Sequence, residues 1–167
     1  GRQYHLFRKR VVVFAGRGGS RCLQVHHEFL IQKPAPAEHE GGRGSGPLAS
    51  AFGRDGIRDD GAPVVATVRH CPTTDQCPYP NASWSRTEEQ MAIGQGFAVD
   101  DVVGHELVHG ITAAESGLYY YYQSGALNES MSDVFGALVK QWSLKQTADK
   151  ADWLIGADIF TPTIKAD

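Results

Sequence analysis

His105-Glu106-Leu107-Val108-His109 is the segment on which the fold and the chemistry of this 167-residue chain depend. Two histidines four positions apart project from the same face of a helix, so both rings can bind one metal ion. Glu106 lies between them and can reach a water molecule beside that ion. The spacing therefore predicts a zinc site on a helix. The alternative is a core helix that carries two incidental histidines.

The residues around this segment extend it into a predicted helix. Asp100 and Asp101 precede the first apolar residues, as acidic residues commonly do at a helix N-terminus. Gly117 is expected to end the helix. Apolar residues at helical spacing predict a buried stripe: Val103, Leu107 and Ile111.

A third metal ligand is predicted from a second helix about twenty residues downstream. Ser124 is expected to cap this helix, and Glu129 and Asp133 lie four apart on one of its faces. Glu129 can bind zinc while Asp133 orients a histidine ligand, although such a pair is also common on a solvated helix face. The predicted apolar face of the same helix consists of Leu127, Met131, Val134, Leu138 and Trp142.

Taken together, these segments resemble the thermolysin-type neutral metalloproteases. The similarity is carried by residues 104–112 and 123–130, and it continues through residues 79–84 and 151–156. It covers about residues 48–162, and its downstream part is closer to the protealysin-like branch. The resemblance implies an α+β fold: a β-rich N-terminal lobe, a central zinc-binding helix and the first helices of a C-terminal lobe.

The same resemblance assigns roles to the motif residues. It makes His105, His109 and Glu129 the ligands of one catalytic Zn²⁺. Glu106 matches the general base that takes a proton from the attacking water and returns it to the leaving amine. Asp133 matches the carboxylate that supports a ligand histidine. The activity implied is that of a zinc-dependent metalloendopeptidase.

Three further residues match positions that contact the substrate in the family. Tyr120 aligns with a tyrosine that stabilises the oxyanion, although Tyr119–Tyr122 could equally form a strand with alternating faces. Asn81 and Ala82 match the edge strand that pairs with the substrate backbone. A peptide or protein substrate is therefore expected.

The chain also departs from the family pattern. It stops at Asp167, whereas family members continue into a helical lobe with a further histidine at the oxyanion, and every histidine here lies at or before His109. The alternative function is therefore a catalytically weak or inactive zinc-binding fragment of such a protease. A structural domain that never binds metal would require all of the matched positions to be coincidental.

A calcium site of the family is not expected to be kept. Asp101 and Asp152 match calcium-binding carboxylates, but Lys140, Leu154 and Ala157 stand where further ligands would be. We expect the Lys140 ammonium to take the place of the cation between the two aspartates. The alternative is a surface lysine without a fixed partner.

The sequence is predicted to have three parts, the first of which is set apart by its charge. Residues 1–46 contain eight Lys/Arg and three Asp/Glu, and the remaining residues contain eight and sixteen. We expect a basic leader of uncertain order at 1–47, the end of the N-terminal lobe with the zinc helix at 48–110, and an incomplete C-terminal lobe at 111–167. The leader could be a remnant of the pro-segment with which family members are made.

The leader predicts no nucleic-acid partner. Its basic cluster at residues 8–10 is short, and Arg21 stands where a dinucleotide loop beginning at Gly16 would need a glycine.

No apolar run is long enough for a membrane helix, and no signal peptide is recognisable. Secretion is expected from the resemblance alone. Cys71 and Cys77 could form a small disulfide or remain free thiols.

Overall fold

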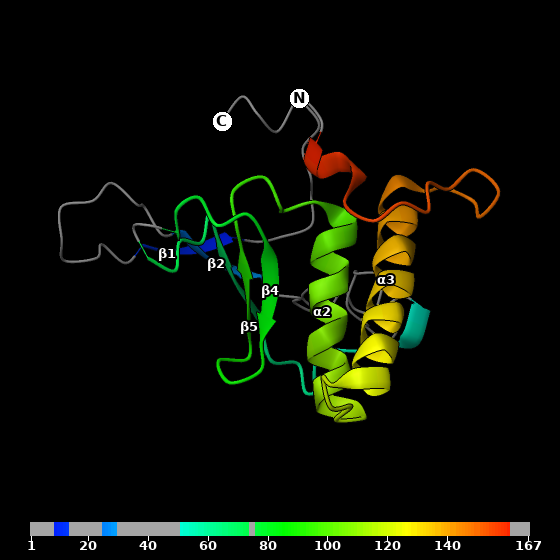
Figure 1. The fold of residues 1–167 in the computed structure, drawn as a ribbon, viewed down its shortest axis with the longest axis horizontal. Helices are drawn as coiled ribbons and strands as arrows, with labels where there is room; N and C mark the ends of the chain where they lie inside the picture. The colour runs from blue at the N-terminus through cyan, green and yellow to red at the C-terminus, as the bar shows by residue number, and fades with distance from the viewer. Residues whose placement is uncertain (1–8, 14–24, 30–50, 74–75, 161–167) are drawn as a thin grey trace, which may run out of the picture.

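The computed structural model describes residues 9–13, 25–29, 51–73 and 76–160. Figure 1 shows a sheet, a helix against it and a second helix beyond the first. The described elements are β1 (Lys9–Val13), β2 (Val25–Phe29), β3 (Val64–Val68), β4 (Ala82–Ser85), β5 (Gln90–Ile93), α2 (Asp100–Glu115), α3 (Tyr122–Leu144) and the 3-10 helix η2 (Ala157–Phe160). The α+β class is confirmed.

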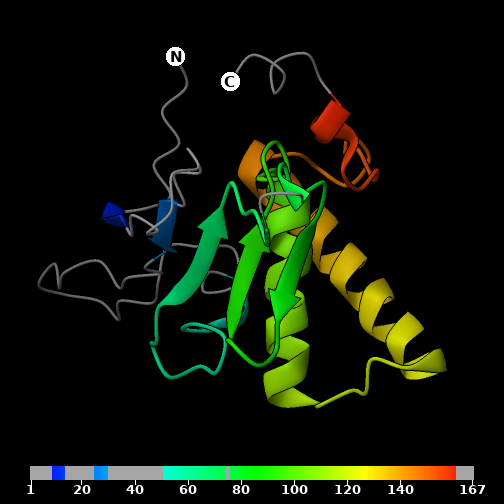
Figure 2. The same cartoon turned by 60° about the vertical axis from the view of Figure 1, so that its left-hand side comes forward.

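The sheet has the strand order β1-β2-β3-β5-β4. The β3–β5 pair is parallel and the other three pairs are antiparallel. Strands β1 and β2 extend the sheet from within the segment that is predicted to be a leader, and the three-part division of the chain remains a prediction. Among the described strands, β4 lies at the end of the sheet beside the helices, as Figure 2 shows.

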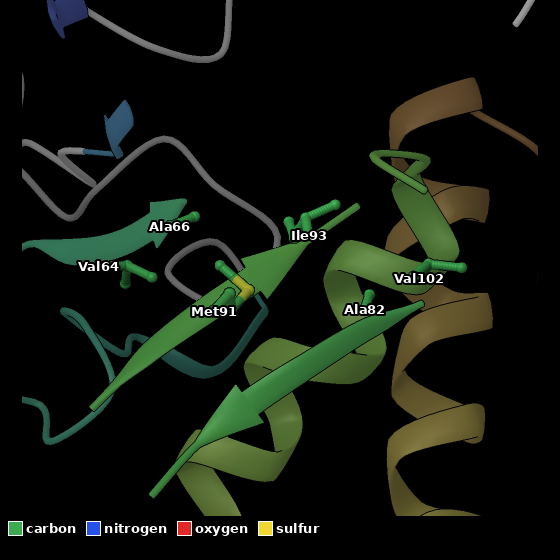
Figure 3. Packing of buried hydrophobic residues seen from close by; sticks show 6 residues of the cluster. All are labelled: Val64, Ala66, Ala82, Met91, Ile93 and Val102. Carbon is green, nitrogen blue, oxygen red and sulfur yellow. The ribbon is translucent and has the colours of Figure 1, made fainter. Parts of the chain in front are cut away.

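The core lies between the sheet and α2. Along β3 and β5, buried residues largely alternate with half-buried ones, so that one face of the sheet is buried. Burying that face removes apolar surface from water, which is the main driving force that holds α2 against the sheet. Figure 3 shows the buried cluster, which consists of Val64, Ala66, Ala82, Met91, Ile93 and Val102.

Helix α2 is bounded much as its sequence predicts. Asp100 and Asp101 lie in its first turn. The Gly117 N–H donates to the Thr112 carbonyl over 2.9 Å with a φ of +59°, a backbone conformation that favours glycine after a helix. Because α2 is packed between the sheet and α3, it buries more than one stripe. The predicted stripe is only half-buried, whereas Val102 and Val108 are buried.

Helix α3 packs with the opposite face from the one its hydrophobic pattern suggests. The predicted apolar face points outward, with exposed fractions between 40% and 52%. The buried face carries small and polar residues instead, among them Asn128, Ser132 and Lys140. A Cβ atom on Gly136 would lie 2.6 Å from the Asp101 carbonyl oxygen, and one on Gly104 would lie 3.0 Å from the Val139 Cβ. These two glycines therefore allow α2 and α3 to approach closely.

The start of α3 corrects two further expectations. The helix begins at Tyr122, so Ser124 lies inside its first turn and is not the N-cap. The Ser124 hydroxyl instead contacts the carbonyl oxygens of Tyr119 and Tyr121, at 2.6 and 2.7 Å. These contacts hold Tyr119–Tyr121 in a loop, which excludes the alternative that the four tyrosines form a strand.

Strand β4 is anchored at its beginning by several contacts. A disulfide joins Cys71 to Cys77 in the loop that leads to it. The Gly94 N–H donates to the Asn81 carbonyl over 2.9 Å, and a Cβ atom on Gly94 would lie 1.7 Å from the Tyr79 carbonyl oxygen. Only glycine fits this position, so the backbone before β4 is closely defined. None of the described helices is both long and apolar enough to cross a membrane.

Candidate metal centre

Three side chains on α2 and α3 bring their donor atoms together. One ligand atom from each of His105, His109 and Glu129 lies within 4.8 Å of the others. The two Nε2 atoms are 2.9 Å apart, and the Glu129 carboxylate oxygens lie 3.1 Å from the Nε2 of His105 and 3.6 Å from that of His109. The helical repeat places the histidines, and the close approach of the two helices places the glutamate.

Hydrogen bonds on the far side of each ring fix how the histidines are oriented. The Nδ1 of His105 lies 2.8 Å from an Asp133 carboxylate oxygen. The Nδ1 of His109 lies 2.8 Å from the Asn128 amide oxygen. Because both partners are acceptors, each Nδ1 carries the proton and each Nε2 keeps a lone pair for a metal ion.

Asn128 and Ser132 also contact a histidine of the candidate metal site, and the sequence analysis did not single them out. Both are buried on α3, and the Ser132 hydroxyl lies 3.2 Å from the Nδ1 of His109. The signal was present in their spacing, since they lie four apart on one helix face, next to Glu129 and Asp133. Polar residues at that spacing are usually solvated, so the pattern alone does not distinguish a buried partner.

Glu106 lies on α2 beside these donors and is buried, with 7% of its surface exposed. Burial raises the pKa of the Glu106 carboxyl above its usual value, since desolvation disfavours the charged form. The neighbouring His109 opposes this shift, Glu129 adds to it, and a hydrogen bond from the Trp84 backbone N–H opposes it. A carboxyl with a raised pKa is suited to exchange protons near neutral pH.

Tyr120 reaches the same centre from the loop before α3. Its hydroxyl donates a hydrogen bond to Glu129, and its ring lies 5.9 Å from the His109 ring. The hydrogen bond with Glu129, followed by burial, raises the pKa of Tyr120 to about 12. The side chain is therefore a neutral hydrogen-bond donor at neutral pH, in contact with one of the three candidate metal donors.

Asn81 and Ala82 lie apart from these side chains, where β4 begins. Asn81 is exposed immediately before the strand, and Ala82 is its first residue and is buried. The hydrogen bond from Trp84 to Glu106 shows that a backbone N–H of β4 is directed toward the centre. The edge of β4 that pairs with no described strand therefore borders the Glu106 carboxylate.

A second charged cluster joins α2, α3 and the segment after α3. The Lys140 ammonium lies 3.3 Å from Asp101, 3.3 Å from Asp152 and 3.0 Å from Asp158. Lys140 is 3% exposed and Asp101 is completely buried. The Asp101 carboxylate also accepts hydrogen bonds from the Val102 and Gly156 backbone N–H groups, at 2.9 and 3.0 Å. The expected pairing of Lys140 with Asp101 and Asp152 is therefore confirmed, and the alternative of a surface lysine without a fixed partner is excluded.

The chemistry of the first cluster fits Zn²⁺. Two imidazole nitrogens and one carboxylate oxygen are ligands that zinc prefers, and three protein ligands leave a fourth tetrahedral position open. The hydrogen-bonded Nδ1 atoms complete the arrangement that metal-binding histidines usually show. The Nε2–Nε2 separation is 2.9 Å, short enough for both rings to contact one ion.

Comparison with known proteins agrees with this geometry. The catalytic domain of thermolysin metallopeptidase matches residues 47–113, and the alpha-helical domain of thermolysin metallopeptidase matches residues 116–167. An extracellular metalloprotease of Pectobacterium carotovorum is 46% identical over 121 residues, which are 68% of this chain and 33% of that protein. A bacillolysin of Bacillus cereus is 40% identical over 68% of this chain and 19% of its own length.

A solved structure shows the same relationship. The precursor of protealysin, a metalloproteinase from Serratia proteamaculans, superposes with a TM-score of 0.58 and 49% identity, over 65% of this chain and 34% of that one. The chain thus spans about a third or less of the length of these relatives. Both family domains match in order along one chain, and so this chain belongs to the thermolysin metallopeptidase family.

Proposed function

We propose that this chain forms the zinc-binding part of a metalloendopeptidase that hydrolyses peptide or protein substrates. The observation that carries the proposal is the position of Glu106, a buried carboxyl on the same helix as two of the three metal donors. The proposed zinc ligands are His105, His109 and Glu129. A metal site that served only structure would not need an additional acid–base group at this place.

The reaction follows from what these side chains can do. Zinc bound at this centre supplies a Lewis acid that polarises the scissile carbonyl and lowers the pKa of a water molecule to about 7. Glu106 accepts the proton of the attacking water as the C–O bond forms. It then delivers that proton to the amide nitrogen as the C–N bond breaks, which releases a carboxylic acid and an amine.

The remaining residues of the site would position the substrate and the ligands. Tyr120, a neutral donor beside Glu129, is proposed to stabilise the oxyanion that develops during attack. Asn81 and Ala82 are proposed to pair with the substrate backbone, because the free edge of β4 can accept another strand. Asp133 is proposed to hold the ring of His105.

Hydrolysis of a blocked dipeptide by the zinc-loaded chain tests this proposal. The parent should release the amine, and the Glu106→Gln variant should bind one equivalent of zinc and release none. Removing the general base should lower turnover by at least about a hundredfold. Comparable turnover in both proteins would refute the role of Glu106.

The second candidate is a zinc-binding fragment with little or no turnover. One observation bears on it: residues 110–167 contain no histidine, so an imidazole donor to the oxyanion would have to come from outside these residues. The loss of one such donor typically lowers turnover by about 10²–10³-fold. Binding of one zinc ion without hydrolysis in the parent chain would establish this candidate.

We also propose that calcium is not required at the second cluster. The Lys140 ammonium already lies among three carboxylates, and calcium needs six to eight oxygen ligands. Leu154 and Ala157 cannot add carboxylate oxygens to that set. Millimolar calcium should therefore leave the thermal midpoint of the chain unchanged, and a strong rise would contradict the proposal.

Export and association with a pro-segment are proposed from the relatives. Several of them are named extracellular proteases, and the solved structure is that of a precursor. Cys71 and Cys77 form a disulfide here, which is usual in oxidising compartments. Detection of the intact disulfide in protein recovered from the culture medium would support export, and free thiols in a cytosolic pool would contradict it.

A further inference from the structure

We propose that a cleft between the end of β4 and the C-terminal half of α2 is a subsite for one substrate side chain, and that Arg86 gives it a preference for a carboxylate. The proposal deepens the proposed function, since it concerns the peptide that would lie along β4. It starts from a cavity of about 210 Å³ at this end of the molecule. Its apolar lining includes Ile57, Trp84, Gly110 and Ala113. Its charged lining residues are Arg58, Asp60, Arg86 and Glu89.

The cleft is aligned with the metal centre along α2. Glu106, Gly110 and Ala113 lie on one face of the helix, since they are spaced by four and then three residues. Gly110 is therefore about 6 Å along the helix axis from Glu106. In Figure 2 the β4 arrow points toward the same end of the molecule as the C-terminal end of α2. A peptide that follows β4 past Glu106 would thus reach the cleft.

The size of the cleft suits a side chain. Pockets for drug-sized molecules usually measure about 300–1,000 Å³, so this one is too small for most of them. The Trp84 indole forms one side, and a Cβ atom on Gly110 would lie 2.9 Å from its ring. The absence of a side chain at Gly110 therefore lets the indole rest on the helix backbone, with Ala113 adding only a methyl group.

Charge gives the cleft its selectivity. Arg86 lies in the turn between β4 and β5, and the neighbouring Arg58 is engaged by Glu89 in an exposed ion pair. The Asp60 carboxylate accepts a hydrogen bond from the Ala62 backbone N–H, with an N–O distance of 2.9 Å. Among the described residues, Arg86 has no such partner, and its guanidinium is exposed at the cleft. An acidic side chain of the substrate could therefore form an ion pair with Arg86 without displacing another described side chain.

The distance from the scissile bond follows from strand geometry. Trp84 hydrogen-bonds to Glu106, and Arg86, the first residue of the turn after β4, follows two residues later, so that it lies at most about 7 Å further along the direction of the strand. A peptide paired with β4 has the same rise per residue. The selected side chain should therefore stand two residues from the scissile bond, on whichever side of it the peptide continues toward the β4–β5 turn.

Peptide binding to the zinc-loaded Glu106→Gln chain tests the subsite without requiring turnover. The probes are four blocked hexapeptides with Glu or Gln placed two residues before or after the central bond. Dissociation constants are measured at low salt, where ion pairs are least screened. In one of the two placements the Glu peptide should bind about threefold more tightly than its Gln counterpart, the ratio expected for an exposed ion pair.

Two added substitutions decide whether Arg86 is responsible. Arg86→Ala should bring the Glu-to-Gln ratio to about one, whereas Lys150→Ala removes an exposed positive charge elsewhere and should leave the ratio unchanged. Equal binding of Glu and Gln peptides, a ratio that survives Arg86→Ala, or no peptide binding at millimolar concentration would each overturn the subsite. A clear Glu preference in these binding assays, together with no hydrolysis by the zinc-loaded parent chain, would keep the subsite and reject the proposed turnover.

Discussion

Replacing Lys140 with methionine should strongly destabilise the chain, because it would leave a buried carboxylate without its counter-charge. Asp101 is completely buried and Lys140 is 3% exposed, so water cannot readily replace the ammonium. Removing one partner of a buried ion pair typically costs about 3–5 kcal/mol. Asp101 keeps its two backbone hydrogen bonds, which places the expected loss near the lower end, at about 3 kcal/mol.

This loss should appear as a lower thermal midpoint. For a chain of this size, about 3 kcal/mol corresponds to a decrease of about 6–12 °C in Tm, measured by scanning calorimetry. Millimolar calcium should restore part of the decrease, because the variant leaves hard oxygen ligands from three aspartates without a cation. Lys150→Ala, whose ammonium lies 3.9 Å from Asp149 on the surface, is the matched control and should change stability by less than about 1 kcal/mol.

Two results would refute this reasoning. A decrease in Tm of less than about 2 °C in Lys140→Met would show that the ammonium does not compensate the buried charge. A double variant that also carries Asp101→Asn should be more stable than Lys140→Met alone, since the buried charge is gone. Equal stability of the single and double variants would show that Asp101 is not the group that Lys140 neutralises.

Three further predictions concern other contacts. The Cys71–Cys77 disulfide closes a short loop with a sequence separation of 6, so reduction should lower stability by about 2 kcal/mol, seen in urea titrations with and without reductant. The pKa of Asp152 is lowered mainly by a hydrogen bond from the Leu154 backbone N–H. The Lys140 ammonium lowers it further. The resulting stabilisation is present above its ordinary pKa and is lost as pH falls through the lowered value, so Asp152→Asn should flatten the acid limb of the stability curve. Asn128→Ala should weaken zinc binding by about 10–100-fold in a chelator competition.

Local spacing made part of the candidate metal centre predictable. Residues four apart on a helix share a face whatever the rest of the chain does, so His105 and His109 could be paired from sequence alone. The contact between Glu129 and the histidines depends on how closely α2 and α3 approach. That approach requires Gly104 and Gly136, whose close contacts only the structure shows.

Hydrophobic patterning was a poorer guide to how α3 packs. Its apolar stripe, which includes Leu127 and Trp142, is 40–52% exposed, and its buried face carries Asn128 and Ser132. These polar groups are buried because the Nδ1 of His109 gives them a hydrogen-bonding partner. The tyrosine run has strong β propensity, but local hydrogen bonds from Ser124 hold Tyr119–Tyr121 in a loop and Tyr122 begins α3. Tertiary partners of this kind are not encoded in the periodicity of a segment.

A calorimetric zinc titration tests the central claim most directly. The metal-free chain should bind one equivalent of Zn²⁺, with binding greatly weakened by His105→Ala and by Glu129→Ala, and only modestly weakened by Asp133→Ala, which leaves all three ligands in place. Folding of each variant is checked by circular dichroism. No binding by the parent, or equally tight binding by the parent and a folded Glu129→Ala variant, would contradict the proposed metal centre.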